Sequence, residues 1–186
     1  VRGTARRLHK QAELVISGQD MMLDTDILNN LVDPLMHLLR NAVDHGIETP
    51  AERLAQGKPE AGLIQIGFAR EGNSIVVKVG DDGRGLDADQ LRAIAHQRGL
   101  IADPDNLSDE QAHRLILMPG FSSRASADRT SGRGLGMDIV RHAVDELRGS
   151  LDIASELGQG AQFRLQMPLT LVSVPVLLLR SAGQVY

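Results

Sequence analysis

The side chains best suited to chemistry gather in one short segment, residues 33–45, with the sequence DPLMHLLRNAVDH. At about 100° per residue, a helix over this segment brings His37, Asn41, Asp44 and His45 within roughly one third of its circumference. The amide oxygen of Asn41 is a hard ligand of the kind that Mg²⁺ prefers. The segment therefore presents groups that can hold a metal ion and polarise a phosphate.

A purely structural interpretation is open for each of these groups. His37 and His45 can be satisfied core histidines, and Asn41 can simply bind solvent. A zinc site built on the two histidines is disfavoured, because they are eight residues apart, twice the spacing of the helical motif H-E-x-x-H, and no third ligand stands out.

Start and stop signals for a helix frame this segment. Asp33 is a favourable N-cap, Pro34 suits the first helical position, and Gly46 can end the helix. Apolar side chains occupy the adjoining sector: Leu35, Leu38, Leu39 and Ala42. We therefore expect one face of the helix to pack against a core and the neighbouring face to line a site.

A first glycine cluster, residues 81–85 (DDGRG), directly follows an apolar strand at 75–79. Glycines after a strand end let the backbone approach a flat ligand closely. The Asp81 carboxylate can accept a hydrogen bond from an exocyclic amine such as that of adenine. The alternative is a simple Asp-Gly turn.

A second glycine cluster, residues 132–136 (GRGLG), precedes a helix expected over 135–148. Its backbone N–H groups and the helix N-terminus make an anion site suited to phosphates. It is not a Rossmann fingerprint, because the third glycine comes too early, and it lacks the Gly-Lys-Ser/Thr of a Walker loop. The alternative is a flexible hinge.

Residues 119–123 (PGFSS) precede the polar stretch 124–130. Glycines at both ends of this region can act as hinges, so the region can form a mobile flap that covers a site. An ordinary long surface loop is the alternative.

Composition excludes several classes of protein. With three Phe, one Tyr and no Trp, the chain has few stacking platforms for single-stranded nucleic acid, and a net charge of −4 disfavours nucleic-acid binding in general. The absence of cysteine excludes disulfides and zinc–thiolate sites. No apolar run reaches membrane-spanning length and no signal peptide is recognisable, so we expect a cytoplasmic domain without direct membrane insertion.

The hydrophobic periodicity predicts an α+β fold. Strands are expected over 11–17, 63–69, 74–79, 150–155 and 162–167. Helices are expected over 24–32, 33–45, 49–57, 87–98, 109–117 and 135–148, with Asp24 and Ser108 as possible N-caps. Two hairpins are expected, one turning at residues 71–73 and the other at residues 157–160. The order is not a strict alternation of strand and helix, so a mixed, mostly antiparallel sheet covered by helices on one face fits better than a doubly wound parallel sheet.

Four motifs, in this order, resemble the ATP-binding catalytic domain of chemotaxis-type (CheA-like) histidine kinases, within the gyrase, Hsp90, histidine kinase and MutL superfamily. Residues 37–48 resemble its asparagine box, 81–85 and 132–136 its two glycine boxes, and 119–123 its phenylalanine box. The segment 49–59 (TPAERLAQGKP) resembles an insert of the chemotaxis branch.

The resemblance implies a Bergerat-type fold, a two-layer α/β sandwich, with ATP and Mg²⁺ bound. His37 and Asn41 would be catalytic, Asn41 would ligate Mg²⁺, and Asp81 would bind the adenine amine. The ATP-binding set that it implies is Arg40, Asp44, His45, Asp81, Gly83, Gly85, Leu86, Ser122, Ser123, Gly132, Arg133, Gly134, Leu135, Gly136 and Met137. Ser122 and Ser123 would belong to a lid, and the second glycine cluster would cradle the phosphates.

His37 stands where hydrolysing relatives place a Glu that activates water. A neutral histidine acceptor already carries a lone pair and needs mainly positioning and charge neutralisation. We therefore hypothesise that His37 favours phosphoryl transfer over hydrolysis.

Two departures from the family pattern stand out. Ala161 replaces a usual Thr, which we expect to loosen a turn near the phosphates. The lid lacks a Lys, and Arg124, Arg129 or Arg133 would have to supply its charge, although a guanidinium is not equivalent to an ammonium.

The resemblance also implies a domain organisation and partners. Residues 1–10 would connect to a preceding dimerisation domain, 11–168 would form the kinase domain, and 169–186 would begin a CheW-like adaptor or regulatory domain. The expected partners are a phosphoacceptor histidine domain, a downstream response regulator, and an adaptor and chemoreceptor reached through the following domain, in a homodimeric whole protein. Alternatives are an ATPase of the same superfamily and a non-catalytic nucleotide-binding scaffold.

Overall fold

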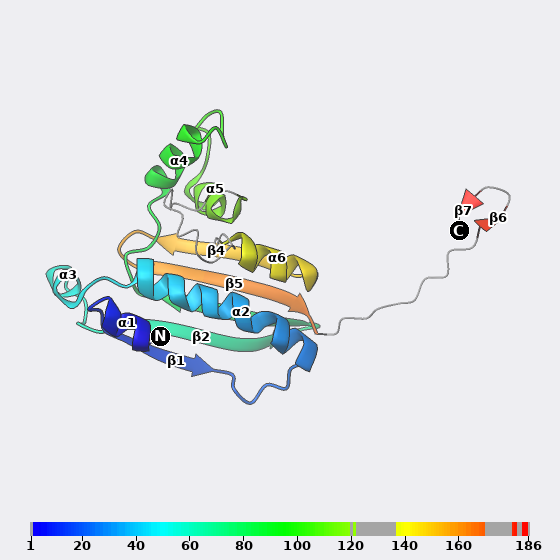
Figure 1. Ribbon diagram of the computed structural model, residues 1–186, viewed down its shortest axis with the longest axis horizontal. Coiled ribbons are helices and arrows are strands. Elements are labelled where there is room, and N and C mark those ends of the chain that lie inside the picture. Colours follow the sequence, from blue (N-terminus) through cyan, green and yellow to red (C-terminus); the bar gives the residue numbers. More distant parts are fainter. Residues whose placement is uncertain (1, 120, 122–136, 170–179, 182–183, 186) are drawn as a thin grey trace.

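A five-stranded mixed sheet forms one layer of the computed structural model, which describes residues 2–119, 121, 137–169, 180–181 and 184–185. The strands are β1 (Ala12–Ser17), β2 (Gly62–Glu71), β3 (Ser74–Asp81), β4 (Ser150–Glu156) and β5 (Gly160–Pro168). Their order is β1-β2-β3-β5-β4 (Figure 1). Only the β1–β2 pair among them is parallel, which confirms the predicted mixed, mostly antiparallel sheet.

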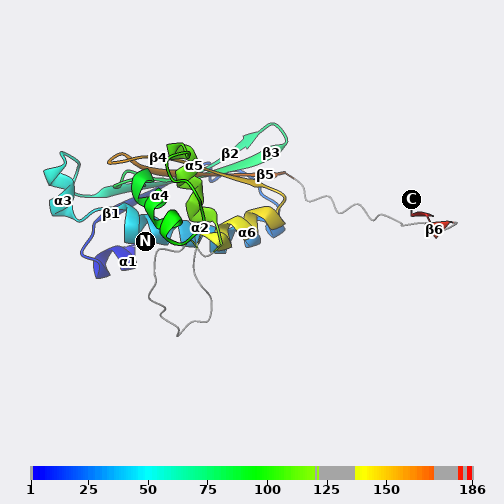
Figure 2. The ribbon, with the colours of Figure 1, turned by 90° about the horizontal axis from the view of Figure 1, so that it is seen from above.

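Part of the helical structure forms the second layer. The described helices are α1 (Arg2–Arg7), α2 (Thr25–Asn41), η1 (Ala42–Gly46), α3 (Pro50–Ala55), α4 (Ala88–Gln97), α5 (Asp109–Arg114), η2 (Leu115–Leu117) and α6 (Asp138–Glu146). Helices α1, α2 and α6 lie on one face of the sheet (Figure 2). Helices α4 and α5 lie beyond the β4 edge (Figure 1). A short ribbon of β6 (Arg180–Ser181) and β7 (Gln184–Val185) forms a separate pair.

The core lies between α2 and the sheet. The apolar stripe of α2 consists of Ile27, Leu31, Pro34 and Leu38, all buried. These side chains follow the 3.6-residue period and face strand residues at alternate positions, among them Val77 and Val79. This packing holds α2 across the sheet.

The predicted helix break at residue 33 is wrong. Helix α2 runs unbroken through Pro34, and its N-cap is Asp24, whose carboxylate accepts the Asp26 N–H at 2.8 Å. Asp33 is an exposed helix-interior residue. The two predicted helices share one apolar stripe, and keeping that stripe on the core outweighs the cost of an interior proline, about 3 kcal/mol.

A smaller apolar cluster joins α4 and α5. It contains Leu91, Ala95, Ala112, Leu115 and Phe121. Phe121 belongs to the predicted phenylalanine box, and its ring lies 5.9 Å from the guanidinium carbon of Arg98. The expected cap of α5 is confirmed, because Ser108 and Gln111 form a reciprocal capping box. The described N-terminal flank of the expected flap is therefore anchored in this cluster.

The remaining predicted elements agree with the structure to within a few residues, including the hairpins of β2 with β3 and of β4 with β5. Helix α6 begins at Asp138, later than predicted, and residues 135–136 lie outside the described part of the chain. Among the described residues, no helix combines the length and apolarity needed to span a bilayer.

Candidate functional site

The C-terminal half of α2 and the following π-turn η1 form one wall of the candidate site. His37 and Asn41 come from adjacent turns of α2, and both approach the start of α6. The Asn41 amide nitrogen donates to the sulfur of Met137 at 3.2 Å, which leaves the amide oxygen as the group able to act as a ligand. The structure therefore brings together two predicted residues that are 96 positions apart.

His37 is almost fully buried, with 8% of its surface exposed. Burial lowers the pKa of His37, the positive charge of Arg40 lowers it further, and Asp138 at the start of α6 opposes them. The imidazole is therefore neutral at neutral pH, because its ordinary pKa of 6.5 already lies below that range. A neutral imidazole keeps one lone pair and one N–H.

The predicted polar side chains in and next to the π-helical turn η1 are not equally buried. Asp44 is half-buried, and its Oδ1 atom is buried without a hydrogen-bond partner among the described residues. His45 and Arg40 are exposed. The four groups predicted to share one face, His37, Asn41, Asp44 and His45, therefore differ in burial.

Lys10, which sequence reasoning did not single out, closes the end of η1. Its ammonium group donates to the carbonyl oxygens of Val43 and Asp44, each at 2.8 Å. Burial lowers the pKa of Lys10, with Arg84 acting in the same direction. These carbonyls end a helix and lack the partners that interior carbonyls have.

Asp81 lies at the end of β3, against Gly46. A Cβ atom at Gly46 would lie 2.8 Å from Oδ1 of Asp81, so a glycine is needed there for the carboxylate to approach η1. The same oxygen accepts the Gly83 N–H at 3.0 Å. Burial raises the pKa of Asp81 to about 6, the neighbouring charge of Asp82 adds to the rise, and backbone hydrogen bonds oppose it.

The glycines of the loop 81–85 serve backbone packing. A Cβ atom at Gly83 would overlap the carbonyl oxygen of Gly46, and one at Gly85 would overlap that of Glu156. Gly85 also has a positive φ of 71°. These contacts explain why glycine is needed at both positions, and the expectation that the loop lies beside a flat ligand stays a prediction.

Leu86 continues this loop into the sheet. Its N–H donates to the hydroxyl of Ser155 at 2.8 Å, and that hydroxyl donates to the Gly160 carbonyl at 2.8 Å. Ala161 follows in β5, paired opposite Asp81, and its backbone hydrogen-bonds the Asp81 carboxylate. Ala161 therefore lies in a strand beside Asp81 and not in a turn, which corrects the expected effect of this departure.

Behind the loop lies an ion network that sequence reasoning missed. Arg53 bridges Glu48 at 3.1 Å and Asp82 at 2.8 Å, and Lys58 contacts Glu48 at 2.8 Å. Arg53 and Glu48 are 0% and 1% exposed. The insert 49–59 was the only sign of this network in the sequence, because no local pattern shows which residues Arg53 and Lys58 contact.

Several predicted site residues lie outside the described part of the chain: Ser122, Ser123, Gly132, Arg133, Gly134, Leu135 and Gly136. Their predicted roles stay predictions. Met137 is the one member of the predicted phosphate-binding set on this side that the structure describes, and it lies at the N-cap position of α6.

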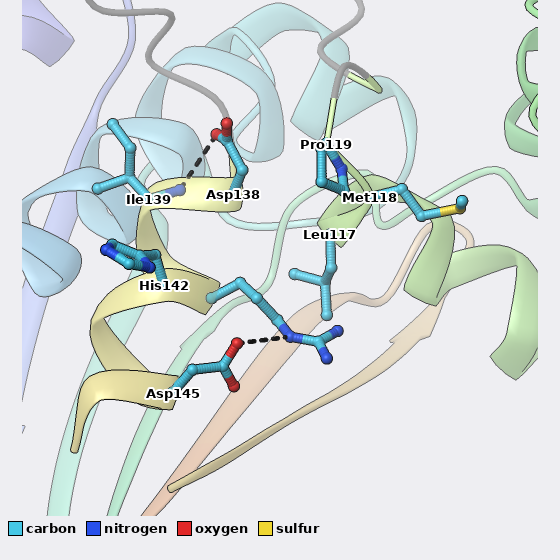
Figure 3. Close-up of a pocket in the computed structure, with 8 residues that line it drawn as sticks. Leu117, Met118, Pro119, Asp138, Ile139, His142 and Asp145 are labelled. Atoms are coloured by element: carbon cyan, nitrogen blue, oxygen red, sulfur yellow. Dashed lines mark hydrogen bonds and ion pairs between the residues drawn. The ribbon is translucent and has the colours of Figure 1, made fainter. Parts of the chain in front are cut away.

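A surface pocket of about 590 Å³ lies between α6 and the segment around η2 (Figure 3). Its lining comprises Leu117, Met118, Pro119, Asp138, Ile139, Arg141, His142 and Asp145. None of these is a predicted site residue. Arg141 and Asp145 pair with each other at 3.3 Å, and Asn41 and Asp81 are not among the residues that line this pocket.

The candidate site has few metal ligands of its own. Among the described residues, no three His, Asp or Glu side chains gather closely enough to hold a metal ion. The amide oxygen of Asn41 and the unpartnered Oδ1 of Asp44 are hard oxygen donors. Such a sparse donor set suits Mg²⁺, which is commonly bound by one or two protein groups together with phosphates and water.

A known family matches most of the chain. The family described as "Histidine kinase-, DNA gyrase B-, and HSP90-like ATPase" matches residues 30–171. This range contains α2, the loop 81–85, α6 and strand β5.

The chain is similar over its whole length to curated bacterial proteins. It is 41% identical over 186 residues to the chemotaxis protein CheA of Treponema pallidum, covering 100% of this chain and 23% of that protein. It is 42% identical over 188 residues to the sensor histidine kinase CheAY of Helicobacter pylori, with the same two coverages, 100% and 23%. The chain thus spans about a quarter of the length of these relatives.

Solved structures share the fold. The catalytic domain of histidine kinase ThkA has a TM-score of 0.55 at 17% identity, covering 90% of this chain and 84% of that one. Full-length ShkA in complex with AMPPNP has a TM-score of 0.54 at 22% identity, covering 94% of this chain and 28% of that one. The likeness confirms the predicted two-layer fold class.

Proposed function

Because the chain belongs to the histidine kinase-, DNA gyrase B- and HSP90-like ATPase family, as a CheA-like histidine kinase ATPase domain, we propose that it binds Mg²⁺-ATP and transfers the γ-phosphoryl group to a histidine on a separate phosphoacceptor domain. The observation that carries this proposal is the single wall formed by α2 and η1. Asn41 lies toward α6 at one end of that wall, and Asp81 lies against Gly46 at the other.

The roles proposed for the two ends follow from their chemistry. As a carboxylate, Asp81 accepts the exocyclic amine of adenine. The amide oxygen of Asn41 would hold Mg²⁺, which would neutralise phosphate charge when bound. In this proposal Arg40, Asp44 and His45 line the phosphate side, and Gly83, Gly85 and Leu86 lie beside the base. Residues 122–123 and 132–136 complete the lid and the phosphate cradle in this proposal.

In the proposed transfer, the acceptor imidazole nitrogen attacks the γ-phosphorus, the new N–P bond forms, and the bond to the leaving ADP oxygen breaks. The attacking nitrogen uses its own lone pair, so this step needs no base. Neutral, buried His37 fits such a step because it packs beside Asn41 without supplying the carboxylate that a water nucleophile would need.

The wider organisation is also a proposal. We propose that residues 1–10 join a preceding dimerisation domain and that 169–186 begin a CheW-like domain, through which an adaptor and a chemoreceptor act. A response regulator would take the phosphoryl group from the acceptor domain. These assignments rest on similarity to relatives whose names are chemotaxis protein CheA and sensor histidine kinase CheAY.

The test has two parts. Calorimetric titration with ATP, with and without Mg²⁺, should show binding that Mg²⁺ strengthens, and Asn41→Ala, which removes the ligand oxygen, should lose that strengthening. Asn29→Ala, an exposed change in the same helix, should keep it. Labelled ATP should then label a separately added acceptor domain. Mg²⁺-stimulated hydrolysis without transfer would favour the ATPase alternative, and absence of nucleotide binding would favour a scaffold.

A further inference from the structure

We propose that the insert 49–59 is a brace that positions Asp81, through Arg53 and Lys58, and thereby sets the base selectivity of the nucleotide site. This inference rests on the proposed function, because it concerns how the base is selected. Neither cation is expected to touch the nucleotide, so both are positioning residues.

Arg53 joins three separate pieces of backbone. Its guanidinium donates to the Glu48 carboxylate at 3.1 Å, to the Asp82 carboxylate at 2.8 Å, to the Asp82 carbonyl at 3.2 Å and to the Pro59 carbonyl at 2.7 Å. The side chain is 0% exposed. A buried guanidinium is tolerated only when its donors are used, so these contacts define one arrangement of the surrounding chain.

Lys58 holds the loop directly. Its three ammonium protons find three acceptors, the Glu48 carboxylate at 2.8 Å, the Asp82 carbonyl at 3.0 Å and the Gly83 carbonyl at 2.8 Å. The Asp82 carboxylate also accepts the Leu63 N–H at 2.8 Å. The two residues that follow Asp81 are therefore held from three directions.

Glu48 connects this brace to the wall formed by α2 and η1. It lies two residues beyond Gly46, which packs on Asp81 and accepts the Arg84 N–H at 3.0 Å. Burial alone would raise the pKa of Glu48, but the hydrogen bonds from Lys58, its own backbone and Arg53 hold it below the ordinary value. Glu48 is therefore a carboxylate, and it ties the end of η1 to the loop that carries Asp81.

Selectivity for the base follows from the hydrogen bond that the Asp81 carboxylate would accept from the base. At the position where adenine carries an amine, guanine carries a carbonyl oxygen, which a carboxylate repels. Discrimination between the two bases depends on holding the carboxylate in place, because a displacement of about 1 Å at a site can cost about 100-fold. If the loop 81–85 were released from Arg53 and Lys58, the Asp81 carboxylate could move away from the adenine amine.

The experiment compares Lys58→Met with Lys78→Met, an exposed lysine of β3 three residues before Asp81. Dissociation constants for ADP and GDP are measured by calorimetry. We expect Lys58→Met to weaken ADP binding about 10-fold, with GDP binding little changed, so that the preference for ADP falls by the same factor. At saturating ATP the transfer rate should change less than the KM.

A second readout needs no nucleotide. Hydrogen exchange at the amides of Gly83 and Arg84 should be faster in Lys58→Met than in wild type and unchanged in Lys78→Met. Glu48→Gln keeps the size of the side chain and removes its charge, so it tests the same brace if Lys58→Met folds poorly. Its preference for ADP should fall in the same direction.

The outcomes separate the two proposals. If the wild type binds ADP but Lys58→Met and Glu48→Gln keep both its base preference and its amide exchange, the brace inference is overturned and the proposed function stands. If the wild type binds no adenine nucleotide, the proposed function is overturned and the base selectivity inferred here goes with it.

Discussion

The ammonium group of Lys10 lies 2.8 Å from the carbonyl oxygen of Asp44 and donates a hydrogen bond to it. A second hydrogen bond of the same length reaches Val43. Lys10 follows α1, whose Ala5 is buried in the main core. The segment that precedes the sheet is therefore fastened to the end of the helix that carries His37 and Asn41.

Replacing Lys10 by Met should lower the free energy of unfolding by about 1–2 kcal/mol, because two helix-terminal carbonyls lose a donor in a half-buried place. Urea denaturation followed by circular dichroism measures this value. Arg7→Met, an exposed change in α1, is the control. An equal loss in both variants would show that the hydrogen bonds to η1 contribute nothing specific.

Asp81→Asn should stabilise the nucleotide-free protein at pH 7 while abolishing ATP binding. The folded-state pKa of about 6 lies above the ordinary 3.8, so between these values the folded protein binds more protons than the unfolded chain and loses stability as pH rises. Above pH 6 the full penalty is present, about 1–3 kcal/mol, and Asn does not carry it.

Denaturation at pH 3.5 and pH 7 tests this difference, with Asp20→Asn, at an exposed position, as the control. The advantage of Asp81→Asn should be present at pH 7 and nearly absent at pH 3.5, because this pH lies below both pKa values and Asp81 is mostly protonated in the folded and the unfolded state. A variant that is less stable than wild type at pH 7 would contradict the burial penalty assigned to Asp81.

His37→Glu should raise the ratio of ATP hydrolysis to phosphotransfer by at least about 10-fold, because a carboxylate beside Asn41 can activate water whereas the neutral imidazole favours a nucleophile with its own lone pair. Phosphate release and labelling of an added acceptor domain are measured side by side. His37→Gln, which supplies no base, should leave hydrolysis slow. An unchanged ratio in His37→Glu would sink the hypothesis.

Gly160→Ala should destabilise the fold by about 2 kcal/mol more than Gly158→Ala. Both glycines have positive φ, 103° and 81°, so both changes introduce backbone strain. Only at Gly160 would the added Cβ overlap the carbonyl oxygen of Asp81, since nothing lies within 4 Å of a Cβ at Gly158. Thermal unfolding compares the two, and equal losses would refute a steric role beside Asp81.

Local chemistry made part of this structure predictable. Asp24 and Ser108 were recognisable caps, because capping joins groups only two or three residues apart. The hairpin between β2 and β3 was recognisable from its turn. The prediction from Pro34 was wrong. Pro34 is typical of a helix start, but the apolar stripe of α2 packs on the core only if the helix continues through this residue.

The sequence by itself determined the family, the order of the motifs and the type of each element, since these depend on residue identity and short-range spacing. Only the tertiary structure decided which groups meet. The contact of Asn41 with Met137 and the brace from Arg53 to Asp82 join residues 96 and 29 positions apart. The raised pKa of Asp81 was likewise decided by packing, because burial against distant segments such as Gly46 is a property of the folded chain that no residue carries alone.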